Sequence, residues 1–231
     1  ALNPAFAVEL FHNFTLVHDD IMDNAEIRRG IPTVHKQFGL NAGILAGDVM
    51  LAYVYKYLTD VPSKFIPDLL QVFNKTAIEI FEGQQMDLDF EKRQDVTETE
   101  YLKMIEYKTS VLMACCVQIG AILAGMGIRE QRMIYDFGLN LGLSFQIKDD
   151  FLDAFGVGSK VGKKIGGDIL NNKKTYLLVN ALNTADKKQK AKLLALVKER
   201  KEKAKIEGTK KIFEEMGVKT ATEKLMNELY N

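Results

Sequence analysis

The chain has 231 residues, 47% of them hydrophobic, and its 31 basic and 31 acidic side chains give a formal net charge of zero. This composition excludes disordered and fibrous chains, the lack of a basic excess argues against general nucleic-acid binding, and no apolar run reaches the roughly 18 residues of a membrane span. Because no signal-peptide pattern opens the chain and its two cysteines are adjacent in an apolar stretch, we expect a globular protein of the reducing cytoplasm.

Apolar residues recur three and four positions apart along almost the whole chain, which is the period of one buried helix face. Strand-like alternation is absent, so we predict an all-α fold with almost no sheet and a single domain over 1–231. Glycine, proline and polar stretches set the ends of the predicted helices, which are 3–23, 40–58, 64–90, 97–125, 129–153, 168–182, 186–205 and 217–229.

Residues 186–211 are rich in lysine, a composition that membrane and nucleic-acid surfaces also show. Leucine and valine form one face of the helix predicted here, and lysine and glutamate alternate on the other. We therefore interpret this segment as a solvated surface helix.

Two aspartate triplets are the most informative part of the sequence. Both have the spacing Asp-Asp-x-x-Asp, and they consist of Asp19, Asp20 and Asp23, and of Asp149, Asp150 and Asp153. In a helix, the first and last carboxylates of such a triplet lie about 40° apart and one turn from each other, while the middle carboxylate is rotated by about 100°. Each triplet ends an apolar helix, where the helix dipole disfavours negative charge, so each predicts a compensating cation.

The chemistry of the triplets favours Mg²⁺, which usually takes one or two carboxylates together with waters and substrate phosphates. A single triplet is more often a solvated helix end, but two in one chain favour a diphosphate site. Such a site also needs basic groups, and these follow both triplets: Arg28, Arg29, Lys163, Lys164, Lys173 and Lys174. Taken singly, each of these would be an ordinary surface charge.

These motifs resemble those of the trans-isoprenyl diphosphate synthases. The run from His18 to Asp23, followed by Arg28-Arg29-Gly30, resembles the first aspartate-rich motif of that family, and the run from Gln146 to Asp153 resembles the second. Further landmarks fall in the family's order, namely Gly43 to Asp48, Gly83-Gln84 with Asp87, Lys108-Thr109, and Gly162 to Asp168 with Lys173-Lys174-Thr175. The resemblance implies antiparallel helices around a deep central cavity.

The implied reaction joins isopentenyl diphosphate to an allylic diphosphate (dimethylallyl, geranyl or farnesyl) and gives a farnesyl or geranylgeranyl diphosphate. In the family, upstream helices with a Gly-Gly-Lys-Arg motif and a further His also bind isopentenyl diphosphate. The resemblance implies that this chain begins after those helices and ends before the family's last ones. It also predicts a homodimer, as does the helix near 102–124, which is apolar nearly all round.

The resemblance also implies roles for single residues. Six carboxylates would hold about three Mg²⁺ ions, directly through Asp19, Asp23 and Asp149, and through water or as supporting neighbours for Asp20, Asp150 and Asp153. The allylic diphosphate would be bound by Arg28, Lys108, Gln146, Lys163 and Lys173, and the isopentenyl diphosphate by Arg29. The catalytic residues would be Lys108, Thr109 and Gln146, with the Thr109 and Gln146 oxygens bound next to the allylic cation.

Two other functions stay open at this point. A terpene cyclase shares the fold and the metal chemistry, but its second metal motif usually mixes Asn, Ser and Glu, whereas this chain has three Asp. A non-catalytic partner subunit of a synthase tends to lose one triplet, whereas both are present here.

Product length is expected to be set on the helix before the first triplet. In the family, the residues four, five and eight positions before the first Asp limit the cavity, and here these are Thr15, Phe14 and Phe11. An aromatic residue at the fifth position and a small one at the fourth predict a farnesyl or geranylgeranyl product, with the longer favoured. The helical wheel favours Phe11 as the floor and the resemblance favours Phe14, while plain core packing of both is the alternative.

Overall fold

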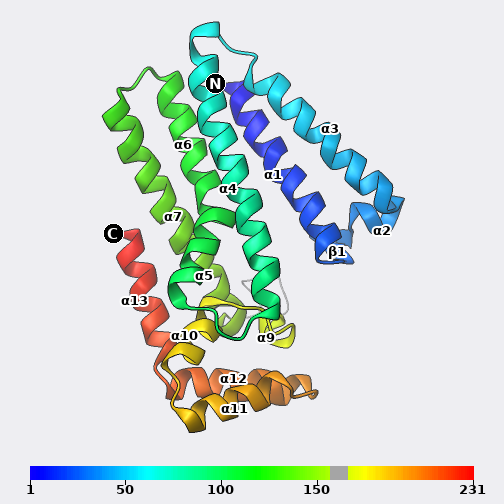
Figure 1. Cartoon of the computed structure of the whole chain (residues 1–231), viewed down its shortest axis with the longest axis vertical. Coiled ribbons are helices and arrows are strands. Elements are labelled where there is room, and N and C mark those ends of the chain that lie inside the picture. The colour runs from blue at the N-terminus through cyan, green and yellow to red at the C-terminus, as the bar shows by residue number, and fades with distance from the viewer. Residues whose placement is uncertain (157–165) are drawn as a thin grey trace. The chain divides into compact units, whose positions relative to one another are not determined.

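The computed structural model describes residues 1–156 and 166–231, and these residues are helical apart from turns, connecting segments and one short hairpin (Figure 1). The predicted all-α class is therefore confirmed. By its internal contacts the chain divides into two compact units, each of which is described by itself. One consists of Ala1–Asn74 and Cys116–Arg132, and the other of Lys75–Cys115 and Met133–Asn231.

The first unit is built on two helices that pack along each other, α1 (Leu2–Met22) and α3 (Leu40–Leu58). Phe11 of α1 is completely buried. The two helices approach closely at Gly47, where an added Cβ would lie 2.1 Å from the Nε2 atom of His18. This contact fixes the last turn of α1, which carries the first aspartate triplet.

A short hairpin and a short helix connect α1 to α3. The strands β1 (Ile27–Arg28) and β2 (Ile31–Pro32) pair antiparallel across a turn of Arg29 and Gly30, which both have positive φ angles. Two such residues are typical of a tight hairpin turn of the type I′ class. The helix α2 (Val34–Phe38) follows. The sequence predicted only a break between helices here, because each of these elements is too short for a periodic pattern.

The rest of the chain forms helices in close succession. In chain order these are η1 (Ser63–Phe65), α4 (Ile66–Lys92), α5 (Glu98–Ile105), the π-helical turn η2 (Glu106–Ser110), α6 (Val111–Leu123), α7 (Ile128–Phe155), α9 (Gly167–Leu170), α10 (Tyr176–Thr184), α11 (Lys187–Val197), α12 (Glu202–Glu215) and α13 (Val218–Tyr230). Both α5 and α11 begin with a capping box. In this motif the side chain of the capping residue accepts a hydrogen bond from the N–H three residues later, and the side chain of that later residue accepts one from the N–H of the capping residue.

Two apolar clusters form the core of the second unit. One joins α5, α7 and α10 through buried residues that include Tyr101, Ile147 and Val179. The other joins α10, α11 and α12 through residues that include Leu193 and Phe213. These clusters position the end of α7, and with it the second aspartate triplet.

The structure corrects two predicted helices. The helix predicted at 168–182 is two helices, α9 and α10, and the second begins at the capping residue Thr175. The helix predicted at 186–205 ends as α11 at Val197, where the Glu199 carboxylate accepts hydrogen bonds from the N–H groups of Arg200 and Lys201 (2.8 and 2.9 Å). A further helix, α12, begins at Glu202 and continues to Glu215, beyond the predicted end. The lysine-rich segment is not uniformly solvated either, since Lys205 of α12 is buried.

One stretch in the described part of the chain, Glu98–Leu123, is long and apolar enough to cross a membrane by length and composition alone. Of its most apolar window, 44% is buried inside the protein. Tyr101, Met104 and Ile105 of this stretch belong to the core of the second unit. The first part of this stretch therefore belongs to the core, and a dimer face on the apolar residues that follow stays a prediction.

Candidate functional site

The first aspartate triplet lies at the carboxyl end of α1, and its middle member is tied into the protein. Asp20 is 5% exposed, and its carboxylate accepts hydrogen bonds from Nε of Arg28 to both oxygens at 2.8 Å. The Nη2 atom of Arg28 lies 2.8 Å from the same carboxylate. This hydrogen bonding raises the pKa of Arg28, and the charges of Asp19 and Asp23 raise it further.

The two outer carboxylates of this triplet lie on the more open side of the helix. Asp19 is half-buried and Asp23 is exposed, and the N–H group of Asp23 bonds to the Asp19 carbonyl (2.9 Å). The predicted separation of the middle carboxylate from the outer two is thus confirmed. Because all three charges act on Arg28, the triplet and this guanidinium form one local cluster.

The second triplet, at the end of α7, repeats this division. Asp150 is 2% exposed and accepts hydrogen bonds from the hydroxyl of Tyr101, from the N–H of Tyr176 (2.9 Å) and from Nε2 of Gln146 (3.2 Å). Burial raises the pKa of Asp150 to about 6, although the bonds from Tyr101 and Tyr176 oppose the shift. Asp150 is therefore a buried structural carboxylate.

The other two members of the second triplet are half-buried. The Asp153 carboxylate accepts a hydrogen bond from the N–H of Asp168 (3.0 Å) and so fixes the start of α9. Burial and the neighbouring charge of Asp168 raise the pKa of Asp153. Asp149 stands one turn before Asp153 on the same face of α7, as predicted.

Basic and polar side chains surround the second triplet within the same unit. Nζ of Lys108 lies 2.6 Å from Oδ2 of Asp87, and Oγ1 of Thr109 donates to Oε1 of Gln146 at 3.1 Å. Thr109 and Gln146 therefore lie next to this triplet, because Gln146 also bonds to Asp150, whereas Lys108 pairs with Asp87.

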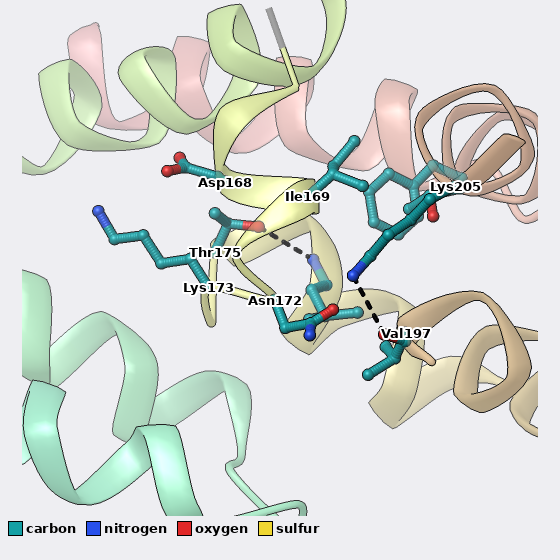
Figure 2. A pocket seen from close by; sticks show the side chains of 10 residues that line it. Asp168, Ile169, Asn172, Lys173, Thr175, Val197 and Lys205 are labelled. Carbon is teal, nitrogen blue, oxygen red and sulfur yellow. Dashed lines mark hydrogen bonds between the residues drawn. The ribbon is translucent and has the colours of Figure 1, made fainter. Parts of the chain in front are cut away.

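Lys173 lies among carboxylates. Desolvation lowers its pKa, but the charges of Asp168, Asp150 and Asp87 outweigh that effect and raise the pKa overall. Figure 2 shows the side chains of Asp168 and Lys173 on the same side of the α9 segment, away from Lys205. The predicted residues Lys163 and Lys164 lie outside the described residues.

The predicted length-determining residues all lie on α1 in the first unit. Phe11 and Phe14 are buried, with ring centroids 5.5 Å apart, and Phe11 also meets the ring of Phe73 edge-on at 5.0 Å. The hydroxyl of Thr15 donates to the carbonyl of His12 (2.8 Å). Arg29, predicted to bind the second substrate, is exposed at the hairpin turn.

Three side chains of the site were not assigned a role from the sequence. Asp87 and Asp168 belong to two of the sequence motifs that resemble those of the family. Their negative charge could have identified them as partners of Lys108 and Lys173, respectively. Tyr101 gives no such signal, because an aromatic residue on an apolar helix normally predicts packing alone.

The donor set fits a hard divalent cation. Among residues 1–156 and 166–231, no three His, Cys, Asp or Glu side chains converge closely enough to hold a metal by themselves. Mg²⁺ does not need such a group, because it usually binds one or two carboxylates and completes its shell with water and phosphate oxygens. Asp19 and Asp23 in the first unit and Asp149 in the second are accessible enough to act in this way.

The chain matches known proteins over most of its length. Residues 1–216 match the model of the polyprenyl synthetase family. The chain is 42% identical to a short chain isoprenyl diphosphate synthase of Methanocaldococcus jannaschii over 197 residues, which cover 85% of this chain and 60% of the relative. The chain therefore spans less than two thirds of the length of that relative.

Solved structures share the same fold. A crystal structure of a geranylgeranyl pyrophosphate synthase superposes with a TM-score of 0.93 at 47% identity, over 98% of this chain and 71% of that one. A geranylgeranyl pyrophosphate synthase of Corynebacterium glutamicum, complexed with isoprenyl diphosphate and magnesium, gives a TM-score of 0.88 at 26% identity, over 99% of this chain and 70% of that one.

Proposed function

The chain belongs to the polyprenyl synthetase family, and from this we propose that it is a prenyltransferase that joins an allylic diphosphate to isopentenyl diphosphate. The observation that carries the proposal is the difference in burial between the carboxylates of each triplet. In each one, the middle carboxylate is buried and bonded to the protein, while the first carboxylate remains partly exposed. The geranylgeranyl synthases among the similar structures support a geranylgeranyl or farnesyl product.

About three Mg²⁺ ions would be held, by Asp19 and Asp23 at the first triplet and by Asp149 at the second. Asp20, Asp150 and Asp153 would support these ligands. When bound, Mg²⁺ neutralises charge on a diphosphate and so makes it a better leaving group. The magnesium in the similar Corynebacterium structure supports this assignment.

The allylic diphosphate would be bound by Arg28, Lys108, Gln146, Lys163 and Lys173. Asp20 orients the Arg28 guanidinium, and Asp87 orients the Lys108 ammonium. Arg can grip phosphate oxygens bidentately, while Lys acts as a point charge. Arg29, exposed at the hairpin turn, would bind the isopentenyl diphosphate.

The chemistry that follows requires stabilisation of positive charge on the allylic carbon as its bond to the diphosphate oxygen breaks. The oxygens of Thr109 and Gln146, 3.1 Å apart, would present their dipoles to that carbon. The double bond of isopentenyl diphosphate then attacks the cation. A proton leaves the new carbocation for an oxygen of the departing diphosphate, which gives a product that is one isoprene unit longer.

The decisive experiment supplies the complete protein with Mg²⁺, labelled isopentenyl diphosphate and each allylic diphosphate in turn. We expect longer linear prenyl diphosphates. Asp19→Ala and Asp149→Ala should remove turnover while circular dichroism stays helical, and Asp68→Ala, at an exposed helical carboxylate, should leave it intact. Cyclic hydrocarbons would indicate a terpene cyclase instead, and a product formed only after adding an active synthase would indicate a partner subunit.

Binding can be measured separately from turnover. Mg²⁺ with inorganic diphosphate should raise the melting temperature, because a ligand that binds only the folded state stabilises it by about 2.7 kcal/mol at a hundred times its dissociation constant. An unchanged melting temperature at saturating concentrations would count against the site.

A homodimer in the cytoplasm is part of the proposal. Besides the apolar helix near 102–124, support comes from α3, which exposes Leu45, Val49 and Tyr53 (62%, 54% and 45%). These residues stand four positions apart, so they form one apolar stripe on the helix surface. A single domain over 1–231 is likewise proposed, because the boundaries between the two units fall inside α4, α6 and α7.

A further inference from the structure

The helix that carries Lys108 and Thr109 is interrupted by a π-helical turn, η2, between α5 and α6. The turn closes with a hydrogen bond from the N–H of Val111 to the carbonyl of Glu106, five residues back. Such a turn inserts one extra residue into an α-helix, and π-turns occur frequently at functional sites. The hydroxyl of Ser110, which is fully buried, donates a hydrogen bond to the carbonyl of Ile105 (3.3 Å) at the start of this irregular stretch.

A glycine of α4 lies directly against this turn. An added Cβ at Gly83 would lie 2.4 Å from the backbone N of Lys108 and 2.8 Å from the carbonyl carbon of Tyr107. Asp87, one turn after Gly83 on the same face of α4, is the partner of Nζ of Lys108 at 2.6 Å. The missing side chain at Gly83 thus allows the backbone approach that places Lys108 on Asp87.

A glycine of α7 repeats the arrangement on a second side of the turn. An added Cβ at Gly142 would lie 2.6 Å from Cα and 2.8 Å from Cβ of Ser110. Gln146, one turn after Gly142, accepts the hydrogen bond from Thr109 at 3.1 Å. In both α4 and α7, therefore, a glycine allows the π-helical turn to approach the helix closely, and the residue four positions later bonds to a side chain of the turn.

We propose that Gly83 and Gly142 are positioning residues that hold the π-helical turn in place, and thereby set Lys108 opposite Asp87 and Thr109 opposite Gln146. The inference rests on the proposed function, in which Lys108 binds the allylic diphosphate and Thr109 faces the allylic cation. Ordinary contact for a Cβ begins at 3.4 Å, so an alanine at Gly83 must displace the Lys108 backbone by about 1 Å. A displacement of this size costs about a hundredfold in rate when it affects a reacting group.

The two glycines make different kinetic predictions, and their matched control is Gly120 of α6, where an added Cβ would meet nothing within 4 Å. Gly83→Ala should raise KM for the allylic diphosphate, which Lys108 binds, and leave KM for isopentenyl diphosphate unchanged, because that substrate is assigned to Arg29. Gly142→Ala should lower kcat by a larger factor than it raises KM for the allylic diphosphate, because the oxygen dipoles of Thr109 and Gln146 act on charge that develops in the transition state. Gly120→Ala should match the wild type.

Double variants separate positioning from packing. If Gly142 acts through Thr109, Gly142→Ala should cost little further turnover in a Thr109→Val background, although it costs about a hundredfold alone. Full additivity of the two losses would overturn the proposal. So would a loss of the helical fold in both Gly83→Ala and Gly142→Ala, which would assign these glycines to packing of the unit alone.

A crystal structure of Gly83→Ala tests the inference without the reaction. We expect the separation between Nζ of Lys108 and Oδ2 of Asp87 to exceed the limit of about 4 Å for an ion pair, and to stay short in Gly120→Ala. An intact ion pair in Gly83→Ala would overturn the inference. If the ion pair breaks but the wild type elongates no allylic diphosphate, the positioning geometry stands and the proposed function fails.

Discussion

Within each aspartate triplet, the middle carboxylate is buried, whereas the first and last carboxylates are more exposed. Asp20 and Asp150 are almost fully enclosed and bonded to Arg28 and to Tyr101, respectively, whereas Asp23 is exposed. A buried carboxylate requires partners, because an unsatisfied charge is expensive to remove from water. The middle carboxylates therefore contribute to folding, whereas Asp19, Asp23 and Asp149 are open enough to bind a cation.

This division predicts different effects for two substitutions in the first triplet. Asp20→Ala should lower the free energy of unfolding by about 1–2 kcal/mol, a figure that allows for the 37% exposure of the Arg28 side chain. Asp23→Ala should change stability by less than about 0.5 kcal/mol and yet reduce turnover at least tenfold. Urea unfolding with turnover assays checks both, and equal destabilisation by the two would contradict the division.

The aromatic residues of α1 make a second prediction at this scale. Phe11 is fully buried against Phe73, and Phe14 is buried beside it. Whichever ring forms the floor of the proposed cavity should give longer products when replaced by alanine, because the growing chain gains the space. Phe11→Ala and Phe14→Ala in the complete protein, with products separated by length, identify it. Unchanged product lengths from both variants would leave the two rings as core packing.

At the scale of elements, a buried lysine bonds to the ends of two helices, α9 and α11, whose ends were not predicted correctly from the sequence. Nζ of Lys205 donates to the carbonyls of Leu170, at the end of α9, and of Val197, at the end of α11, each at 3.1 Å. Figure 2 shows its amine among the residues that line a small pocket and bonded to Val197. Carboxyl ends of helices carry unpaired carbonyls and partial negative charge, so one ammonium satisfies both ends.

Replacing this lysine should destabilise the second unit. Lys205→Met keeps the apolar stem but leaves two helix-terminal carbonyls without their donor, which we expect to cost about 2–3 kcal/mol. Burial lowers the pKa of Lys205, which shows that the buried ammonium itself costs stability. This cost offsets part of the stabilisation from the two hydrogen bonds, so we do not expect a loss larger than about 3 kcal/mol. Lys203→Met, at a side chain that is 87% exposed, is the control and should change stability little. Urea unfolding of the two variants decides, and equal values would exclude the capping role.

At the scale of the whole molecule, the apolar stripe on α3 predicts self-association. A solvent-exposed stripe of this kind normally marks an interface. We expect the complete protein to be a dimer in light scattering, and Val49→Lys to make it a monomer, because a charge in an apolar interface is not compensated. Ile128→Lys, at a residue that is 86% exposed on α7, is the control and should leave the dimer intact. A monomeric wild type at micromolar concentration would refute the dimer.

The sequence by itself determined the helical class, the bounds of α3, and the carboxylates that share a face in each triplet. These are local properties, because helical periodicity, helix breakers and the 3.6-residue turn act within a few residues. Asp19 and Asp23 could be placed together, and Asp20 apart from them, without any tertiary contact. For the same reason the short elements between α1 and α3 and the break between α11 and α12 were missed.

Only the tertiary structure decided which side chains meet across the sequence. Lys108 finds Asp87 at 21 residues' distance and Asp150 finds Tyr101 at 49, and neither pairing follows from local spacing. The burial of Lys205 within a lysine-rich segment depends on the two helix ends that it joins. Such contacts arise from the packing of helices whose backbones approach closely only where a glycine permits it, as at Gly83. The sequence shows the glycine, but only the packed helices show what approaches it.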